Sequence, residues 1–375
     1  MSVSAVRIDL DAIRRNVATL MERASGKAVM AVVKADGYGH GMVESARAAL
    51  AGGATWLGVA MADEALSLRA AGIDAPALAW LLGPTDDWQA VVAAQVDVGV
   101  YAGWGLDRAI AAAARTGRPS RVHLKVDSGL GRGGAQPSAW PDLVEAAAKA
   151  KADGTVDVVG IWSHLAYADD PANPTIEAQR RTFDEALDVA TRAGLQPTVR
   201  HLANSAATLR LPETHYDLVR PGVAIYGLSP GPAVGEAREL GLTPAMTLTS
   251  RLALTKRTPA GHGVSYGHRY TTSGETTLAL VPLGYADGVP RQLTNLGEVT
   301  IAGKRYRMAG TVCMDQFVLD VGDDSVMAGD EVVLFGPGAS GEPTADEWAA
   351  AIGTINYEIV SRVGARVPRI YEGAL

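Results

Sequence analysis

Cysteine is almost absent from this chain of 375 residues, and so are long apolar runs and clustered basic residues. With Cys313 as its single cysteine, the chain forms no internal disulfide, which fits a reducing compartment. The formal net charge of -7 is spread along the chain, with no basic block to favour nucleic acid. No uncharged apolar run approaches the roughly 18 residues of a membrane span, and the N-terminus has no apolar core of signal-peptide length. We therefore expect a cytoplasmic protein that binds a small molecule and neither nucleic acid nor a membrane.

The first part of the chain alternates short apolar runs with amphipathic, alanine-rich stretches. Short buried strands alternating with helices indicate parallel βαβ units. The runs are 29–33, 56–60, 77–82, 97–101, 122–126, 158–163, 198–202 and 217–219, and the helical candidates are 42–51, 62–71, 106–115, 141–151 and 175–193. Eight such strands predict a (β/α)8 barrel of the TIM type. The alternative is a doubly wound open sheet, but no GxGxxG loop follows the first strand.

After about residue 235 the pattern changes to the period-two alternation of β-strands. The alternating segments are 246–255, 277–282, 298–301 and 316–321, with a single helical candidate at 345–352. They predict a mostly antiparallel β domain. Residues 5–10 resemble a strand that joins this second domain. We therefore expect a barrel domain at 11–235 and a β-rich domain at 236–375, the latter joined by the N-terminal segment 1–10.

Polar side chains follow several of the predicted barrel strands, where active sites of such barrels lie. The first strand ends in MAVVKADGYGHG, residues 30–41, which delivers Lys34 and Tyr38. Later strands deliver Lys125, Asp127, Arg132, Ser163, His164, His201, Ser205, Arg220, Gly222 and Val223. Taken singly, His164 can be a buried core histidine and Arg220 a surface charge. Their convergence on one end of the barrel is not explained in that way, and it favours a functional site.

The chemistry at these strand ends suits a phosphorylated cofactor. The loops after strands seven and eight of such barrels commonly bind phosphate, and here they offer the Ser205 hydroxyl and the Gly222 and Val223 amides. Lys34 supplies an amine on the same rim. One amine for a Schiff base and one anion anchor are the two attachments that pyridoxal phosphate needs. These residues predict that cofactor without specifying the reaction.

The motifs together resemble those of the alanine racemases of bacteria, over nearly the whole chain. AVVKADGYGHG is similar to the cofactor-lysine signature of that family. KVDSGLGR, SHLAYAD, HLANSA, VRPGVAIYG, VSYG, GYADG and CMDQ follow in the family's order. This resemblance implies a barrel and a β domain, pyridoxal phosphate, no metal, and a homodimer with shared active sites. It also implies interconversion of L- and D-alanine, which supplies D-alanine for peptidoglycan.

The resemblance assigns roles to individual residues. Lys34 corresponds to the Schiff-base lysine, and Tyr266 to the second base, contributed by the other subunit. Arg220 corresponds to the residue at the pyridine nitrogen, with His164 and His201 linking Arg220 and Tyr266. The remaining matches are Tyr38, Ser205, Gly222, Val223 and Tyr357 for the phosphate, Arg132 and Met314 for the substrate carboxylate, and Lys125 for a lysine that is often carbamylated.

Other functions remain open at this point. Decarboxylases of the same fold usually place a carboxylate at the pyridine nitrogen, which Arg220 opposes. A racemase of broader range, or one for serine, would share all of these motifs. A pyridoxal phosphate carrier would not need the β domain that contains Tyr266. A cofactor-free Schiff-base aldolase would not need a phosphate site together with Arg220.

Overall fold

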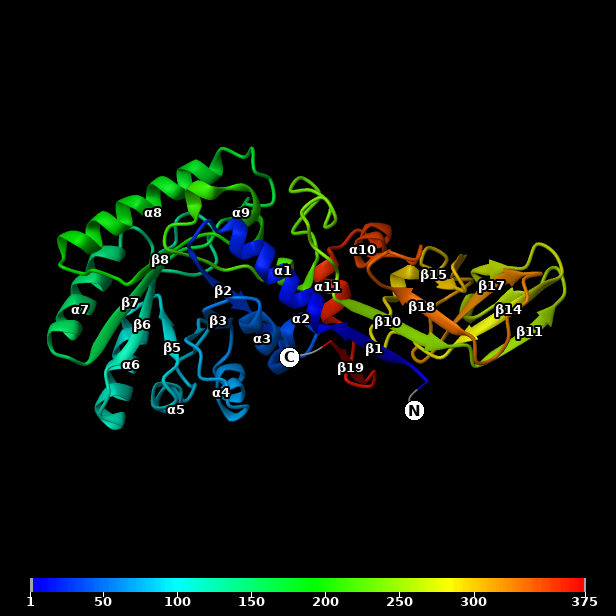
Figure 1. The fold of residues 1–375 in the computed structure, drawn as a ribbon, viewed down its shortest axis with the longest axis horizontal. Helices are drawn as coiled ribbons and strands as arrows, with labels where there is room; N and C mark the ends of the chain where they lie inside the picture. Colours follow the sequence, from blue (N-terminus) through cyan, green and yellow to red (C-terminus); the bar gives the residue numbers. More distant parts are fainter. Residues whose placement is uncertain (1–2, 374–375) are drawn as a thin grey trace.

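The computed structural model describes residues 3–373, which form two parts joined end to end (Figure 1). A barrel surrounded by helices makes up one part, and a β-rich part extends from it. The segments that connect them include the N-terminal strand and the last helices of the chain. None of the helices within residues 3–373 is long and apolar enough to cross a membrane.

Eight parallel strands form the barrel, as the apolar runs predict, and the fold class is confirmed. The strands are β2 (Ala28–Val32), β3 (Trp56–Val59), β4 (Ala77–Ala79), β5 (Asp97–Val100), β6 (Ser120–Lys125), β7 (Val156–Trp162), β8 (Val199–His201) and β9 (Leu218–Val219). Their order runs β8-β7-β6-β5-β4-β3-β2-β9. The Asp217 amide donates to the Arg200 carbonyl (3.0 Å) and the Arg220 amide to the Ala203 carbonyl (2.9 Å), which joins the two outer strands and closes the barrel.

Helices cover the outside of the barrel with one apolar face each. In α8 (Thr175–Arg192) the buried side chains include Ile176, Phe183, Ala186 and Ala190, a helical spacing. The other helices of this part are α1 (Leu10–Arg23), α3 (Met42–Ala51), α4 (Ala62–Ala70), α5 (Trp88–Ala93), α6 (Gly103–Thr116), α7 (Trp140–Ala152) and α9 (Ser205–Arg210). Three of them, α1, α5 and α9, are not among the helices predicted above. Each begins after a capping side chain, Asp9, Asp87 and Asn204 respectively.

The β-rich part contains two main sheets. The larger sheet has the order β16-β15-β18-β10-β1-β19, with β1 (Ala5–Asp9), β10 (Met246–Arg251), β15 (Glu298–Ile301), β16 (Lys304–Arg307), β18 (Glu331–Phe335) and β19 (Arg369–Glu372). The smaller sheets are β11 (Leu254–Thr258), β14 (Thr276–Val281) and β17 (Phe317–Gly322), and the pair β12 (Gly263–Val264) and β13 (Tyr270–Thr271). The predicted run 246–255 is thus two strands in two sheets. Strand β1 pairs antiparallel with β10 and parallel with β19, so both ends of the chain lie in one sheet.

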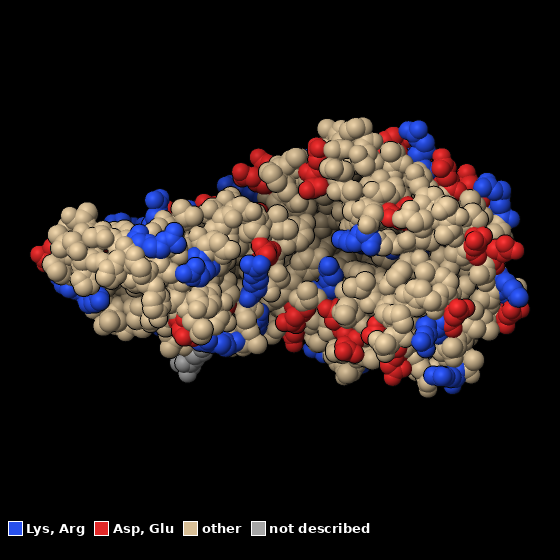
Figure 2. Space-filling model, turned by 180° about the vertical axis from the view of Figure 1, so that it is seen from behind, with Lys and Arg blue, Asp and Glu red and all other residues tan. Residues whose placement is uncertain are grey.

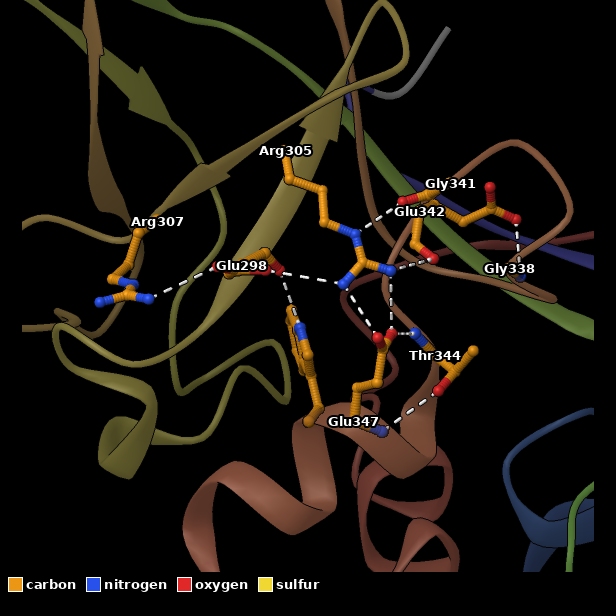
Figure 3. Close-up of polar contacts among 9 residues, drawn as sticks. Glu298, Arg305, Arg307, Gly338, Gly341, Glu342, Thr344 and Glu347 are labelled. Carbon is orange, nitrogen blue, oxygen red and sulfur yellow. Dashed lines mark hydrogen bonds and ion pairs between the residues drawn. The ribbon is translucent and has the colours of Figure 1, made fainter. Parts of the chain in front are cut away.

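An ion-pair network around Arg305 fastens a helix to this sheet (Figure 3). Arg305 on β16 pairs with Glu347 (2.9 Å) and Glu298 (3.6 Å) and donates to the Gly341 carbonyl (2.7 Å). Glu347 also closes the capping box of α10 (Ala345–Ile352) with Thr344. The next helix, α11 (Asn356–Ser361), packs on the barrel, so this network steadies the junction of the two parts.

Candidate functional site

Lys34 stands at the start of a left-handed turn. It opens the short helix α2 (Lys34–Tyr38) directly after β2, at the C-terminal end of the barrel strands, called here the barrel rim. Ala35, Asp36, Gly37 and Tyr38 have φ values of 53°, 51°, 61° and 54°. Residues other than glycine rarely adopt this backbone region, and each of them costs about 1–2 kcal/mol there. A turn of this kind persists only where its surroundings hold it.

Three side chains hold that turn. Glu64 Oε1 accepts from the Ala35 amide at 2.6 Å, and Asp36 Oδ1 accepts from the Met42 amide at 2.9 Å. The buried His40 ring places Nδ1 3.0 Å from the Gly37 and Tyr38 carbonyls. Because both partners are carbonyls, Nδ1 carries the proton. The Lys34 amine is therefore presented from a braced segment rather than from a mobile loop.

The surroundings of Lys34 favour its neutral form. Burial lowers the pKa of Lys34, the Arg132 cation lowers it further, and the Glu64 carboxylate acts in the opposite direction. The Arg132 side chain is exposed and makes no hydrogen bond or ion pair with any residue in 3–373. A free guanidinium beside an amine whose pKa is lowered suits an anionic ligand that brings a reactive carbonyl.

Arg220 is the centre of a buried polar network at the same rim. Its guanidinium donates to the Ser163 and Leu202 carbonyls at 2.8 and 3.1 Å. It also lies 3.0 Å from His201 Nδ1 and 3.3 Å from His164 Nδ1. Burial lowers the pKa of Arg220 to about 9, so the group is still a cation at neutral pH. The structure thus brings together Arg220, His164 and His201.

Both histidines in this network are neutral. Burial, followed by the charge of Arg220, holds the pKa of His164 and of His201 well below the usual range. Arginine has only donors, so the Nδ1 atom that faces it is an acceptor in each ring and the proton resides on Nε2. His164 therefore directs an N–H away from Arg220.

The Lys125 amine is buried close to two other positive charges. It is buried, with Nζ 4.6 Å from the centre of the Trp162 ring. Burial lowers the pKa of Lys125 to about 8, and the charges of Arg132 and Arg220 act in the same direction. Asp127 opposes this shift, but its carboxylate already accepts from the amides of Gly129, Leu130 and Gly131. A neutral amine is thus accessible at physiological pH.

A second cluster on the rim consists of Tyr38, Ser205, Gly222, Val223 and Tyr357, called here the phosphate cup. Ser205 Oγ accepts from the amides of Gly222 (2.8 Å) and Ala224 (3.3 Å). Neither the Tyr38 nor the Tyr357 hydroxyl is hydrogen-bonded to a residue in 3–373, and their rings lie 6.2 Å apart. A Cβ at position 222 would lie only 2.4 Å from the Tyr38 hydroxyl. The Gly222 amide is therefore engaged by Ser205, and the two tyrosines offer the free donors.

Tyr266 and Met314 lie on the β domain and are open to solvent, 74% and 53% exposed. The Tyr266 segment and the loop at 311–314 are tied together, since Thr311 Oγ1 donates to the Tyr266 carbonyl (2.8 Å) and Ser265 Oγ to the Thr311 carbonyl (2.7 Å). Tyr285, also exposed, is joined to the same loops through the Cys313 carbonyl (3.0 Å). We call Tyr266, Tyr285 and Met314 the β-domain face. Within residues 3–373, neither Tyr266 nor Met314 forms a hydrogen bond with Arg220 or Lys34, so neither belongs to the barrel network.

The molecular surface is hollowed between the two parts, and Lys and Arg side chains lie on the walls of the hollow (Figure 2). At the rim, beside the effect of burial, the charge of Arg132 lowers the pKa of both Lys34 and Lys125. A cationic recess attracts a ligand that bears phosphate or carboxylate.

The structure adds residues to the site that the sequence analysis did not single out. Trp162 lies beneath the Arg220 guanidinium (5.0 Å) and stacks on His201. His123 and Asp97 continue the network behind His201. Glu64 braces the Lys34 turn. Of these added residues, only His123 could have been found from the sequence. The alternation of polar and apolar residues in RVHLK places this histidine inside the predicted barrel.

Comparison with known proteins places both parts of the chain. The family described as "Alanine racemase, N-terminal domain" matches residues 8–230, and "Alanine racemase, C-terminal domain" matches residues 245–371. An alanine racemase of Frankia casuarinae is 65% identical over 368 residues, which cover 98% of this chain and 96% of the relative. One of Thermobifida fusca is 58% identical, covering 100% and 99%.

Solved structures agree with this placement. The alanine racemase of Streptomyces lavendulae, a D-cycloserine producer, has a TM-score of 0.99 and 54% identity, covering 100% of this chain and 98% of that one. The alanine racemase of Bacillus anthracis with bound L-Ala-P has a TM-score of 0.90 and 36% identity, covering 100% and 96%.

Proposed function

Because the chain belongs to the alanine racemase family, and is thus an amino-acid racemase of the isomerase class, we propose that it interconverts L-alanine and D-alanine with pyridoxal phosphate as cofactor. The observation that supports this most directly is the meeting of three groups at the barrel rim: the Lys34 amine, the phosphate cup and the Arg220 network. Each group suits a different part of that cofactor.

The residues present fit pyridoxal phosphate. Lys34, with its lowered pKa, is suited to hold the cofactor carbonyl carbon covalently. Tyr38 and Tyr357 offer hydroxyls that form no hydrogen bond within residues 3–373, and the lack of a Cβ on Gly222 leaves room for the Tyr38 hydroxyl. Ser205 and Val223 complete the cup. When bound, this cofactor delocalises the negative charge that develops at the substrate α carbon.

Arg220 would hold the ring nitrogen of the bound cofactor. A guanidinium is only a donor and keeps its proton, so it would donate a hydrogen bond to that nitrogen without protonating it. The carbonyls of Ser163 and Leu202 and the face of Trp162 fix its orientation. A cofactor held in this way would withdraw electrons less strongly, and Arg220 would thereby limit protonation at the wrong carbon and hence transamination.

Two bases on opposite faces move the α proton. Lys34 takes it from D-alanine on one face, and Tyr266 of a second copy takes it from L-alanine on the other. Tyrosine normally titrates near 10, so its phenolate needs a positive neighbourhood. Arg220, together with the His164 Nε2–H, supplies one at the rim. The arrangement accounts for a reaction that runs in both directions.

The substrate carboxylate has a free partner in Arg132. We propose that carbamylation of Lys125 orients that guanidinium, with His201 supporting Arg220 behind it. The modification replaces a cation that is crowded by Arg132 and Arg220 with an anion, which removes the repulsion. The backbone of Met314, from the second copy, completes the carboxylate site.

A homodimer with shared active sites would account for this division of residues. Tyr266 and Met314 belong to one continuous loop cluster that is exposed in the single chain. Large exposed side chains gathered at one place are typical of interaction surfaces.

We also propose the domain division at 11–235 and 236–375, with 1–10 joined to the second part. D-alanine made in the cytoplasm would serve peptidoglycan.

Chiral chromatography of L-alanine incubated with the cofactor-loaded protein tests this function. We expect D-alanine to accumulate until the two enantiomers are equal. L-serine, run in parallel, separates an alanine racemase from a broader one. No D-amino acid from either substrate, in a protein that binds the cofactor at Lys34, would overturn the proposal and favour a cofactor carrier.

A further inference from the structure

A chain of hydrogen bonds crosses the barrel interior behind Arg220. His201 Nε2 lies 2.8 Å from His123 Nδ1, and His123 Nε2 lies 3.0 Å from Asp97 Oδ2. His201 is the last residue of β8 and Asp97 the first of β5, so the chain runs from the rim to the opposite end of the barrel. We call Arg220, His201, His123 and Asp97 the Arg220 relay. All four side chains are buried.

Only one arrangement of protons satisfies every contact in the relay. The arginine donates, so His201 Nδ1 accepts and His201 carries its proton on Nε2. That proton points at His123 Nδ1, which must accept, and the His123 proton then resides on Nε2. It is donated to the Asp97 carboxylate, which only accepts. Reversing either ring would place two donors or two acceptors face to face.

The barrel is shaped around this relay. A Cβ at Gly160 on β7 would lie 2.2 Å from His123 Nδ1, so the glycine makes room for the ring. Trp56 meets the edge of His123, and Trp162 stacks on His201 at an interplanar angle of 4°. Barrel interiors are otherwise filled by bulky apolar side chains. A row of hydrogen-bonded polar side chains inside the barrel implies a role beyond packing, because burying polar groups without partners costs folding free energy.

The relay also connects two opposite charges. Arg220 forms no ion pair with a carboxylate in the described part of the chain, although a buried cation without one is costly. Asp97 is the carboxylate at the far end, where Arg121 holds it with Nε at 2.6 Å. Burial raises the pKa of Asp97, but its hydrogen bonds with His123 and Arg121 outweigh burial and lower the pKa overall, so Asp97 stays ionised at neutral pH.

We infer that Asp97 and His123 are positioning residues for Arg220: they fix the tautomer of His201, so that a lone pair always faces the guanidinium. The consequence for the cofactor ring nitrogen rests on the proposed function. The statement about the tautomers does not, and it can be tested on the folded protein alone.

Asp97→Asn is the discriminating substitution. Arg121 donates to this side chain, so the amide oxygen turns to Arg121 and the amide N–H turns to His123. His123 and His201 then both change tautomer, and His201 presents an N–H to Arg220. Asp157→Asn is the matched control, because Asp157 is exposed, faces the same Arg121 at 3.8 Å, and loses the same charge outside the relay.

The measurement is nitrogen NMR of the holoenzyme labelled with ¹⁵N-histidine, in which protonated and unprotonated ring nitrogens have distinct shifts. The chain has seven histidines, and His→Gln variants at the other five assign the two of interest. We expect Nε2–H for His201 and His123 in the wild type and in Asp157→Asn, and Nδ1–H for both in Asp97→Asn. In a racemase assay, kcat of Asp97→Asn should fall roughly 10- to 100-fold with little change in KM, as when an outer partner of a bound group is lost.

Two results would overturn the inference: a wild-type His201 with its proton on Nδ1, or a folded Asp97→Asn protein with unchanged tautomers. Should Asp97→Asn fail to fold, Gly160→Ala replaces it. The added methyl displaces the His123 ring, and His201 should then show a mixture of tautomers. A single unchanged Nε2–H form in Gly160→Ala would contradict the role of His123. An absence of racemase activity with the expected tautomers would count against the proposed function and not against the relay.

Discussion

The barrel rim and the β-domain face differ in how completely one chain satisfies them. At the rim, Arg220 has protein partners for most of its N–H groups, and the Lys34 turn is braced from several sides. On the β-domain face, Tyr266 and Met314 extend into solvent. The rim is preorganised before anything binds, whereas the face is incomplete in the single chain.

This difference distinguishes the part of the proposed site that one chain holds in place from the part that a second copy is proposed to supply. Preorganised charges act only if their supporting contacts hold them in place. The rim meets that condition through buried hydrogen bonds, which supports the proposal that the rim of one chain holds the cofactor. The face has fixed loops, but the Tyr266 and Met314 side chains form no hydrogen bond within residues 3–373. In the proposed dimer, a second copy of the chain contacts them.

Lys34→Ala should abolish the proposed function of the barrel rim. It removes both the covalent attachment and one of the two proposed bases, so racemisation should fall at least about 10⁴-fold. The rate of D-alanine formation and the mass of the borohydride-reduced protein measure the two roles. Lys149→Ala, an exposed lysine on α7, is the control and should retain both properties. Cofactor still attached covalently to the Lys34→Ala protein would contradict the assignment.

Tyr266→Phe should remove the proposed base on the β-domain face and leave the residues of the barrel rim unchanged. Loss of a positioned acid–base group costs roughly 10²–10⁴-fold, here in proton removal from L-alanine. Lys34 should still exchange the α proton of D-alanine with deuterium from solvent, which NMR follows for each enantiomer. Tyr270→Phe removes a nearby hydroxyl that is bonded to Asp320 and serves as the control. Equal loss of exchange from both enantiomers would count against two separate faces.

Gly222→Ala should weaken the phosphate cup without touching either base. The added methyl would lie 2.4 Å from the Tyr38 hydroxyl, so the ring has to move. Losing one hydrogen bond to a charged group costs about 1.5–3 kcal/mol, so cofactor affinity should fall roughly 10-fold or more. Absorbance titration measures it, and kcat at saturating cofactor should recover. Gly103→Ala, where a Cβ meets nothing within 4 Å, is the control. Unchanged affinity would show that Tyr38 does not bind phosphate.

Lys125 should give the smallest effect, visible as pH-dependent stability. As a free amine its pKa is about 8 in the folded protein and near 10.5 unfolded. The unfolded state then binds the extra proton between those values, so stability rises with pH across that window. Relative to Lys125→Gln, protein stripped of carbon dioxide should gain roughly 2 °C or more in Tm from pH 8 to 10. Protein kept in bicarbonate should show no such gain, because a carbamate has no amine to titrate. The same pH dependence in both preparations would contradict carbamylation.

Much of the barrel could be predicted from the sequence, because each strand is a short apolar run with clear ends. Helix α1 was missed because the N-terminal segment was interpreted only as a strand, although Asp9 is an ordinary helix cap. The left-handed turn after Lys34 could not be predicted, since Ala35 has no preference for positive φ. That conformation depends on hydrogen bonds from Glu64, which is distant in the sequence, and from the buried His40 ring.

The site shows the same limit. Which residues lie at the rim follows from where the strands end, so Lys34, His164 and Arg220 could be named in advance. His123 and Asp97 could not, because a polar residue within a strand does not reveal its partner across a barrel. Tyr266 was named by resemblance alone. Its exposure became apparent only from the structure.

The central proposal is that each active site combines the rim of one chain with the β-domain face of another. Mixing inactive Lys34→Ala and Tyr266→Phe proteins, after subunit exchange is verified by mass, tests it most directly. In a symmetric dimer, random exchange rebuilds about a quarter of the sites, so about a quarter of wild-type racemase activity should return. Exchange without any recovery of activity would show that Lys34 and Tyr266 act within one chain, and would contradict the proposal.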